Sequence, residues 1–89
     1  MSQSQNPWYV YMMRCADNSL YTGITTDLTR REKQHNSNSA AKYTRCRQPV
    51  KLVYYEPQKC RSSASKREYQ LKQLTKKAKE KLVQQTSQN

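Results

Sequence analysis

Arg31 and His35 are two side chains that could act on a phosphate group, and they lie four residues apart. On a helix this spacing puts both on one face, together with Leu28. The forked guanidinium of arginine matches phosphate geometry, so Arg31 could neutralise a phosphoryl group. Two simpler interpretations stay open. Arg31 can lay its stem along the core edge with its head in water, and His35 can be a favourable cation at a helix end.

Glu68 lies among apolar residues on a second predicted helix, where a carboxylate must be paired, hydrogen-bonded or bound to a metal. The apolar stripe around it consists of Ala64, Leu71 and Leu74. Carboxylate oxygen is the ligand that a hard cation such as Mg²⁺ prefers. Two alternatives stay open for Glu68: a capping box that begins at Ser65, and an ion pair with Arg31.

Tyr11 and Tyr21 lie on two neighbouring predicted strands, so their hydroxyl groups could face one site. A buried tyrosine usually just satisfies its hydroxyl with one hydrogen bond. A phenol has an ordinary pKa of about 10, so it can act as a general base only if nearby cations lower that pKa. Phenols, an arginine, a histidine and a lone carboxylate together are the parts that phosphodiester cleavage needs.

The elements that must position these side chains begin with a predicted hairpin. After Pro7, the run 8–14 is rich in aromatic and β-branched residues and predicts a strand, and 20–24 predicts a second. Between them, Asp17 and Asn18 tolerate the backbone angles of a tight turn. We expect the two strands to pair in antiparallel fashion.

A helix and a third strand follow the hairpin. The periodic segment 28–35 predicts a helix, with Thr26 or Asp27 as its cap. The apolar run 49–56 predicts a strand that opens with Pro49. Proline is tolerated there because the first position of a strand needs no ladder hydrogen bond.

Two further helices are predicted near the C-terminus. The first covers 62–74 and is capped by Ser62 or Ser63, and the second covers 75–83 and is capped by Thr75. The order of elements is therefore ββαβαα, which places the chain in the α/β (α+β) class. We expect a disordered segment at 1–6, a single domain at 7–83 and a frayed end at 84–89.

The charge of the chain predicts a polyanionic partner. Among 89 residues, 17 Lys and Arg against six Asp and Glu leave a net charge of +11. Such a surface attracts DNA, RNA or an anionic membrane, although a basic surface can also serve only solubility. A membrane is disfavoured because no predicted helix combines a wide apolar face with a basic one.

The cysteines predict a reducing compartment. Cys15, Cys46 and Cys60 are odd in number and contain no C-x-x-C pair, which argues against a zinc finger. Lone cysteines suit the cytoplasm, and no secretory signal or long apolar run is present. We expect a cytoplasmic protein.

The basic residues cluster in two segments, with seven between Arg30 and Lys51 and seven between Lys66 and Lys81. Each segment contains a candidate site residue, so a positive surface could lead to the site. Gly23, the single glycine, is expected to leave the sheet bare so that a phosphate can approach. The expected nucleic-acid contacts are Gly23, Arg30, Lys42, Arg45, Arg47, Lys66 and Lys72.

These residues resemble the GIY-YIG nuclease superfamily. The letters YVY at 9–11 look like its GIY element, and YTG at 21–23 look like YIG. Arg31 and His35 follow that glycine by eight and twelve residues, and Glu68 lies in ASKREYQLKQL, all matching the family pattern. The sequence is most similar to the small stand-alone bacterial YhbQ-like members, and also to the nuclease domain of the Slx-type endonucleases.

The resemblance implies a small three-stranded antiparallel sheet flanked by helices, and an endonuclease that cleaves DNA with the help of Mg²⁺ or Mn²⁺. It implies that Tyr11 and Tyr21 are the paired tyrosines, one of them the general base. Arg31 would stabilise the phosphorus in the transition state, with His35 in support, and Glu68 would hold the metal. A role in DNA repair is implied by relatives.

The sequence departs from the family pattern at two supporting positions. Ile24 stands where a lysine often follows the second glycine, and no asparagine follows Glu68 before Asn89. The alternative function is therefore a nucleic-acid-binding module of the same fold with little or no catalysis. With room for one domain, we expect low sequence specificity. The sequence does not choose between DNA and RNA, and it leaves the oligomeric state open.

Overall fold

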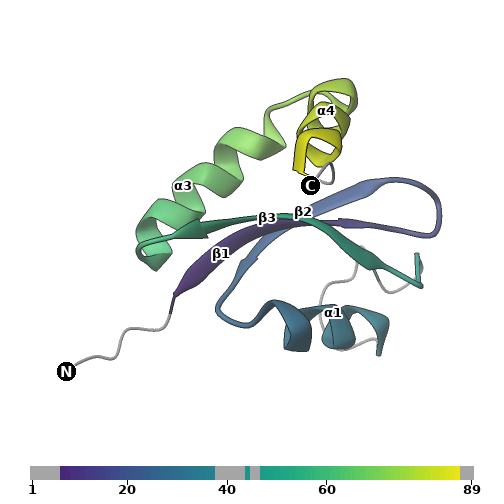
Figure 1. Ribbon diagram of the computed structural model, residues 1–89. Coiled ribbons are helices and arrows are strands. Elements are labelled where there is room, and N and C mark those ends of the chain that lie inside the picture. The colour runs from purple at the N-terminus through teal and green to yellow at the C-terminus, as the bar shows by residue number, and fades with distance from the viewer. Residues whose placement is uncertain (1–6, 38–43, 45–46, 87–89) are drawn as a thin grey trace.

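A three-stranded antiparallel sheet forms the centre of the molecule. The computed structural model describes residues 7–37, 44 and 47–86. Strand β1 (Trp8–Arg14) lies between β2 (Leu20–Thr25) and β3 (Lys51–Gln58), and pairs with both in antiparallel fashion. Helix α1 (Leu28–Asn36) lies on one face of this sheet (Figure 1). The predicted order ββαβαα and the three-stranded antiparallel sheet are confirmed.

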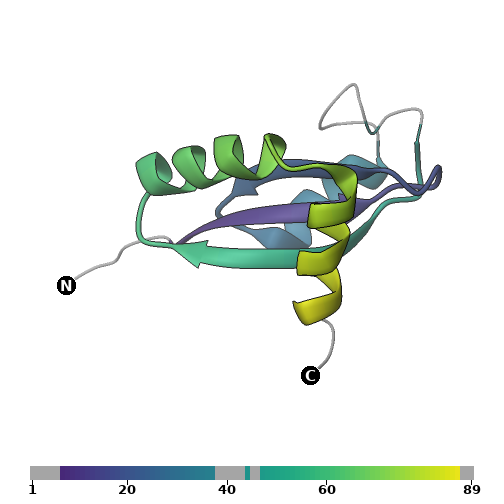
Figure 2. The same cartoon turned by 90° about the horizontal axis from the view of Figure 1, so that it is seen from above.

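Helices α3 (Arg61–Lys72) and α4 (Lys76–Thr86) lie on the opposite face from α1, as Figures 1 and 2 show from two directions. Strand β1 is therefore covered on both sides. Its residues 10–13 are fully buried, which is why this apolar run takes the central position. Successive side chains of a strand point to opposite faces, so β1 supplies both layers of the core.

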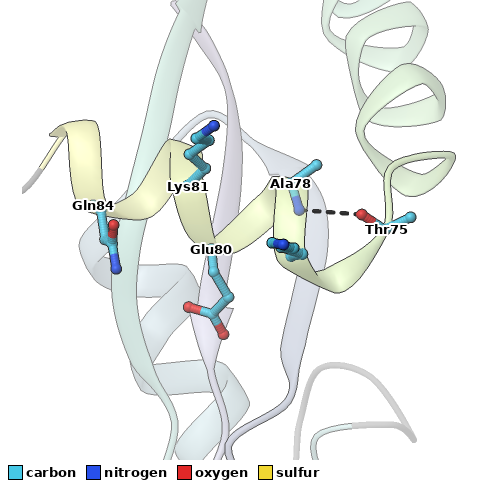
Figure 3. Close-up of a pocket in the computed structure, with 6 residues that line it drawn as sticks. Thr75, Ala78, Glu80, Lys81 and Gln84 are labelled. Atoms are coloured by element: carbon cyan, nitrogen blue, oxygen red, sulfur yellow. Dashed lines mark hydrogen bonds between the residues drawn. The ribbon is translucent and has the colours of Figure 1, made fainter.

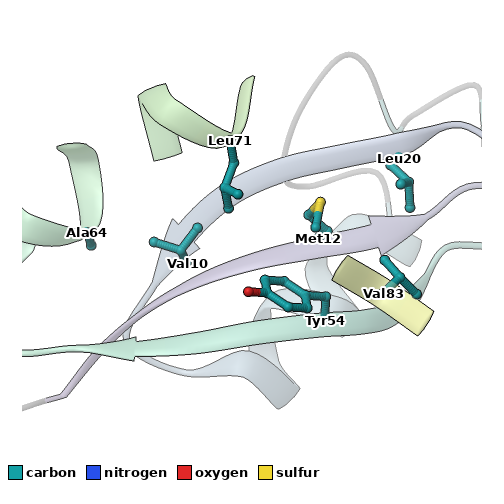
Figure 4. Packing of buried hydrophobic residues seen from close by; sticks show 7 residues of the cluster. All are labelled: Val10, Met12, Leu20, Tyr54, Ala64, Leu71 and Val83. Carbon is teal, nitrogen blue, oxygen red and sulfur yellow. The ribbon is translucent and has the colours of Figure 1, made fainter. Parts of the chain in front are cut away.

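The apolar core lies between the sheet and helices α3 and α4. Val10 and Met12 supply the β1 side of this cluster, and Ala64 and Leu71 supply the α3 side. Figure 4 shows Val10, Met12, Leu20, Tyr54, Ala64, Leu71 and Val83 converging there. Burying these side chains supplies most of the stability available to so short a chain, because apolar burial is the main favourable term in folding.

The layer beneath the sheet, on the α1 side, is smaller and richer in tyrosine. Its buried members are Tyr11, Met13, Cys15 and Val50, with Tyr21, Leu28 and Leu52 packed against them. Tyr11 and Met13 reach this layer because they alternate with Val10 and Met12 along β1. The candidate site residues of the strands therefore face α1.

The hairpin and the start of α1 form as the sequence predicts. Asn18 adopts a left-handed φ of 70°, and the Cys15 N–H donates to the Ser19 carbonyl at 2.9 Å across the turn. Asp27 caps α1, since its carboxylate accepts a hydrogen bond from the Arg30 N–H at 3.0 Å. The helix ends at Asn36, one residue beyond the predicted 28–35.

Strand β3 lies two residues further along than the predicted 49–56. The Val50 N–H and carbonyl bond to the Asn36 side chain at 2.7 and 3.0 Å, so these groups are not part of the ladder. At its other end β3 continues through Pro57. Proline is tolerated there because β3 is an edge strand of the sheet.

The predicted cap of α3 is wrong. Helix α3 begins at Arg61, so Ser62 and Ser63 lie within its first turn, and the cap position is Cys60, which makes no side-chain capping bond. The predicted end at 74 is also wrong. The helix ends at Lys72, and Leu74 is 36% exposed rather than part of the buried stripe.

Helix α4 follows a predicted cap and then exceeds its predicted length. The Thr75 hydroxyl accepts a hydrogen bond from the Ala78 N–H at 3.2 Å, as a capping residue does. The helix continues to Thr86, through three residues that were expected to fray, and it buries Val83 against the sheet. The segments 1–6 and 87–89 lie outside the described residues. The single-domain boundary at 7–83 stays a prediction.

Candidate active site

Tyr11 crosses from β1 over the neighbouring strand at Gly23. The two residues are direct partners in the antiparallel register. A Cβ atom placed on Gly23 would lie 2.5 Å from the Tyr11 hydroxyl oxygen and 2.7 Å from Cζ. The expectation that Gly23 leaves a bare surface for a phosphate is therefore wrong. Glycine is needed at this position because the tyrosine ring already occupies the surface above it.

The Tyr11 hydroxyl is the meeting point of the two candidate residues from α1. Its oxygen lies 3.0 Å from His35 Nε2, and Arg31 Nε donates to it at 3.4 Å. The other ring nitrogen, His35 Nδ1, lies 2.8 Å from the Thr44 hydroxyl. Tyr11, His35 and Thr44 are all fully buried, so this chain of hydrogen bonds is closed to solvent.

The direction of these hydrogen bonds follows from the donors. A guanidinium only donates, so the Tyr11 oxygen accepts from Arg31. In the tautomer that carries the ring proton on Nδ1, the Tyr11 hydroxyl donates to His35 Nε2 and His35 donates to Thr44; in the other tautomer both directions reverse. Burial lowers the pKa of His35, and the positive charge of Arg31 lowers it further. His35 is thus held as a neutral imidazole.

The Tyr11 phenol is held in its protonated form. Burial raises its pKa, and the hydrogen bond and positive charge of Arg31 oppose this in part. The nearby Tyr21 and Glu68 raise the pKa further. For Tyr11, the lowered pKa that a general base requires is therefore not found in the free protein. The cation that could lower it is in place, but desolvation is the larger effect.

Tyr21 lies beside Tyr11 and His35 and is only partly buried. Its ring centroid is 6.4 Å from that of Tyr11 and 5.1 Å from that of His35. It stands two residues before Gly23 on β2, so both tyrosines occupy the same face of the sheet. The structure thus brings together the two tyrosines, as the sequence predicts, and leaves Tyr21 as the one that reaches solvent.

Arg31 lies partly buried at the border of this cluster. Besides its bond to Tyr11, its Nη1 donates to the Gln34 side chain at 3.0 Å. The simpler interpretation, in which its head lies only in water, is wrong, because the guanidinium is bonded to two side chains. The fork is thereby held beside the hydroxyl of Tyr11.

Glu68 lies partly buried on α3, the helix that packs on the opposite face of the sheet from α1 (Figure 1). Its carboxylate is close enough to Tyr11 to raise the pKa of that phenol. It forms an ion pair with Lys72, one turn further along α3, at 3.1 Å. The capping-box alternative is wrong because Ser65 lies inside α3. The predicted alternative of an ion pair between Glu68 and Arg31 is also wrong, because among the described residues Glu68 pairs with Lys72.

The donors fit magnesium or manganese better than zinc. Among the described residues, no group of three or more His, Cys, Asp or Glu side chains could hold a metal ion. Mg²⁺ needs no such cage, since one carboxylate with waters and substrate phosphates is enough. The Glu68 side chain is 24% exposed, and its partner Lys72 is 52% exposed. Such a surface ion pair is weak and easily displaced.

The predicted nucleic-acid contacts are dispersed. Arg30 on α1 and Lys66 on α3 are exposed, and Lys72 is paired with Glu68. Arg47 is bonded to Asp17 at 3.0 Å, beside the hairpin turn. Gly23 is buried beneath Tyr11, and Lys42 and Arg45 lie outside the described residues.

A pocket of about 460 Å³ lies along α4, apart from the tyrosine cluster. Figure 3 shows its lining, which consists of Thr75, Lys77, Ala78, Glu80, Lys81 and Gln84. Glu80 is already bonded to Arg14 and Lys76, which lowers its pKa to about 2. None of the candidate site residues lines this pocket, so it is separate from the candidate site.

Thr44 is the residue of the cluster that sequence reasoning missed. It lies nine residues beyond His35, and no periodicity or motif marks it. Its role depends on the chain returning to His35, which local pattern does not reveal. The one available signal was His35, because a buried imidazole needs a hydrogen-bond partner for each ring nitrogen, and the second partner had to come from elsewhere in the chain.

Comparison with known proteins places this geometry in a family. The model of the GIY-YIG catalytic domain matches residues 7–82. The chain belongs to the GIY-YIG family. It is 56% identical over 77 residues to the UPF0213 protein DP2720 of Desulfotalea psychrophila, covering 85% of this chain and 70% of that protein. It is 52% identical over 77 residues to the UPF0213 protein YhbQ of Escherichia coli K12, covering 86% and 77%.

Two solved structures share the fold. The solution structure of the UPF0213 protein BH0048 from Bacillus halodurans is 43% identical, with a TM-score of 0.59 over 92% of this chain and 87% of that one. The solution structure of EF2693 from E. faecalis is 37% identical, with a TM-score of 0.62 over 99% and 94%. The predicted likeness to YhbQ is confirmed. No helix in the described ranges is long and apolar enough to cross a membrane.

Proposed function

We propose that this GIY-YIG domain is a metal-dependent endonuclease that hydrolyses DNA phosphodiester bonds with low sequence specificity. The observation that carries the proposal is the convergence of Arg31 and His35 on the Tyr11 hydroxyl, with Glu68 within electrostatic reach. These groups come from three different elements, β1, α1 and α3. The net charge of +11 favours a polyanionic substrate.

Arg31 is the group that neutralises the reacting phosphate. Its fork lies at the border of the buried cluster, and Nε is fixed by the Tyr11 hydroxyl. A guanidinium held in place before the substrate arrives stabilises developing charge without further reorganisation. Tyr11, which is fully buried, positions Arg31 and His35.

Tyr11 and His35 support the site from beneath. Both are fully buried, so neither meets a group in solvent directly, and the lowered pKa of His35 opposes its protonation. Thr44 holds the His35 ring in place. Tyr21, partly exposed, is the tyrosine placed to contact substrate.

Glu68 is the residue that would hold Mg²⁺ or Mn²⁺. Such an ion supplies a Lewis acid that stabilises negative charge on the phosphate and the leaving oxygen. Its carboxylate is close enough to act on the pKa of Tyr11, and its surface ion pair with Lys72 is weak enough for a metal to displace.

The test is cleavage of labelled single-stranded, duplex and branched DNA with Mg²⁺ or Mn²⁺. We expect cleavage by the native protein, none after chelation, and a loss of at least about a hundredfold in Glu68→Gln. The matched control is Lys72→Gln, which removes the same ion pair but leaves the carboxylate. Equal losses in both variants would show that Glu68 acts only through Lys72. Wild-type rates in Glu68→Gln would overturn the site.

A second function is favoured by the raised pKa of Tyr11. A site that holds its phenol protonated can bind a nucleic acid without turning it over. This module would bind DNA or RNA in a salt-sensitive way, because neutralised phosphates release counterions. Tight, salt-dependent binding with no cleavage of any of these DNAs in either metal would favour it.

A further inference from the structure

One end of the sheet face that carries the candidate site extends beyond α1. In Figures 1 and 2, α1 lies beneath the middle of the sheet and the side toward the β1–β2 hairpin. The start of β1 and the end of β3 run past it. Of the helices that the structure describes, α1 is the one on this face, and it lies toward the other end (Figure 1).

Two tyrosines lie on this end of the face. Tyr55 is the direct cross-strand partner of Tyr11, and Tyr9 lies two residues before Tyr11 on β1, so all three point to the same side. The rings of Tyr9 and Tyr55 meet edge to face, with centroids 5.9 Å apart and planes at 77°. Tyr55 is 48% exposed. The Tyr55 ring thus contacts Tyr9 and is still half exposed.

This pair differs from an ordinary exposed aromatic side chain. In the described part of the chain, the large exposed hydrophobic residues are Tyr55, Tyr69 and Leu74. Of these, Tyr55 is the one that lies directly opposite Tyr11 on the neighbouring strand, where Cβ atoms are about 5 Å apart. Tyr55 thus flanks Tyr11 on the β3 side, whereas the Tyr11 hydroxyl, to which Arg31 and His35 bond, reaches over β2.

A nucleobase is the flat group that this surface fits. Every base offers a π-face, and stacking on a protein aromatic ring is tolerant of sequence. An edge-to-face neighbour holds the Tyr55 ring in place, so less conformational freedom is lost when a base stacks on it. In a duplex the base faces are covered by their neighbours. Only an unpaired or unstacked nucleotide can present one, and the charge of +11 draws its strand to the protein.

We propose that Tyr9 and Tyr55 form a stacking site for an unpaired nucleobase of the strand that enters the candidate active site. The placement of that strand rests on the proposed function, whereas the stacking itself does not. The substrate class is then nucleic acid with an unpaired segment at the point of cleavage: a single strand, a flap or a loop.

The test measures binding without metal, so that cleavage does not interfere. The probes are a short single-stranded oligonucleotide that carries a fluorescent purine analogue, and the same oligonucleotide with abasic sites in place of its bases. We expect the native protein to quench the analogue and to prefer the oligonucleotide with bases. Tyr55→Ala should weaken binding of that oligonucleotide by about fivefold to a hundredfold and leave the abasic one unchanged.

Two variants keep the result interpretable. Tyr55→Phe retains the ring and should bind like the native protein, which separates stacking from loss of the hydroxyl. Tyr69→Ala removes a tyrosine that is 68% exposed on α3, and should leave the base preference intact. The comparison of the two oligonucleotides on the native protein needs no variant, so a folding defect in Tyr55→Ala cannot hide the answer.

The outcomes separate the two proposals. Equal binding of the two oligonucleotides by the native protein overturns the stacking site, even if the protein cleaves DNA. Equal weakening of both by Tyr55→Ala also overturns it. Base-dependent binding that is lost in Tyr55→Ala supports the stacking site, even if no DNA is cleaved and the nuclease proposal fails.

Discussion

The two faces of the sheet surround a buried tyrosine hydroxyl with different groups. On the α3 and α4 face, the Tyr54 hydroxyl donates to the Glu56 carboxylate, which also accepts from Arg67 at 2.9 Å. Burial and the carboxylate raise the pKa of Tyr54 to about 12. On the α1 face, Tyr11 meets a guanidinium and a neutral imidazole instead.

The difference lies in what each phenol contacts. Tyr54 faces a carboxylate whose pKa is lowered by Arg67, so Glu56 stays charged and the phenol stays protonated. This cluster joins α3 to β3. Tyr11 contacts the neutral His35 and the cation Arg31 instead, and burial raises its pKa more than the positive charge of Arg31 lowers it. The pKa of the phenol is therefore raised on both faces, and only on the α1 face does it contact candidate site residues.

The largest effect should come from Arg31, which tests whether the α1 face carries the chemistry. Arg31→Ala should lower the single-turnover rate of metal-dependent cleavage by about a hundredfold to a thousandfold, because the charge on the phosphate is no longer neutralised. Arg31→Lys keeps the charge without the fork and should lose less. Denaturation curves check that both variants fold. A wild-type rate in Arg31→Ala would show that the chemistry is not on the α1 face.

Leu71 tests the opposite face of the sheet, where α3 and α4 pack on the apolar core. Leu71→Ala should lower the free energy of unfolding by about 2–5 kcal/mol, because a fully buried side chain leaves a cavity beneath α3. The volume-conserving Leu71→Met should cost less than about 1.5 kcal/mol. Urea denaturation gives both values. Cleavage by the folded fraction should be unchanged, and a loss as large as that of Arg31→Ala would mean that the two faces are not separable.

Gly23 tests the packing of Tyr11 on the α1 face, because the Tyr11 ring lies directly over it. Gly23→Ala should lower the free energy of unfolding by about 1–3 kcal/mol, since its Cβ would overlap the Tyr11 ring. The same substitution in a Tyr11→Ala background should cost much less, which a double-mutant cycle measures. An equal cost in both backgrounds would contradict the contact.

The smallest effect should be the pH dependence due to His35. Its pKa is lowered in the folded state, so the unfolded chain binds a proton at a higher pH than the folded one. The free energy of unfolding should therefore fall as the pH drops through the ordinary histidine pKa of about 6.5. Urea titrations between about pH 7.5 and 5.5 measure this slope. A slope that persists in His35→Gln would assign it to another group.

Much of the fold was predictable because its signals are local. The turn residues Asp17 and Asn18 and the cap Asp27 act within a few residues of themselves, and the structure confirms each. The start of β3 was not predictable, because Val50 is removed from the ladder by Asn36, fourteen residues away. The α3 cap was misplaced because the helix begins without a side-chain cap at Cys60.

The candidate site divides in the same way. The spacing of Arg31 and His35 put both on one face of α1, and both reach the same hydroxyl. Thr44 carries no local signal, and it was missed. The role of Gly23 was misjudged, since sequence shows that a side chain is missing but not what fills the space.

The sequence by itself determined the order of elements, the alternation that sends Tyr11 and Met12 to opposite faces, and the positive charge. These depend on the periods of strands and helices and on composition alone. Only the tertiary structure decided that the Tyr11 ring lies over Gly23, that Glu68 pairs with Lys72, and that burial raises the pKa of Tyr11. Desolvation and distance depend on which segments cross in space, and no local pattern carries that information.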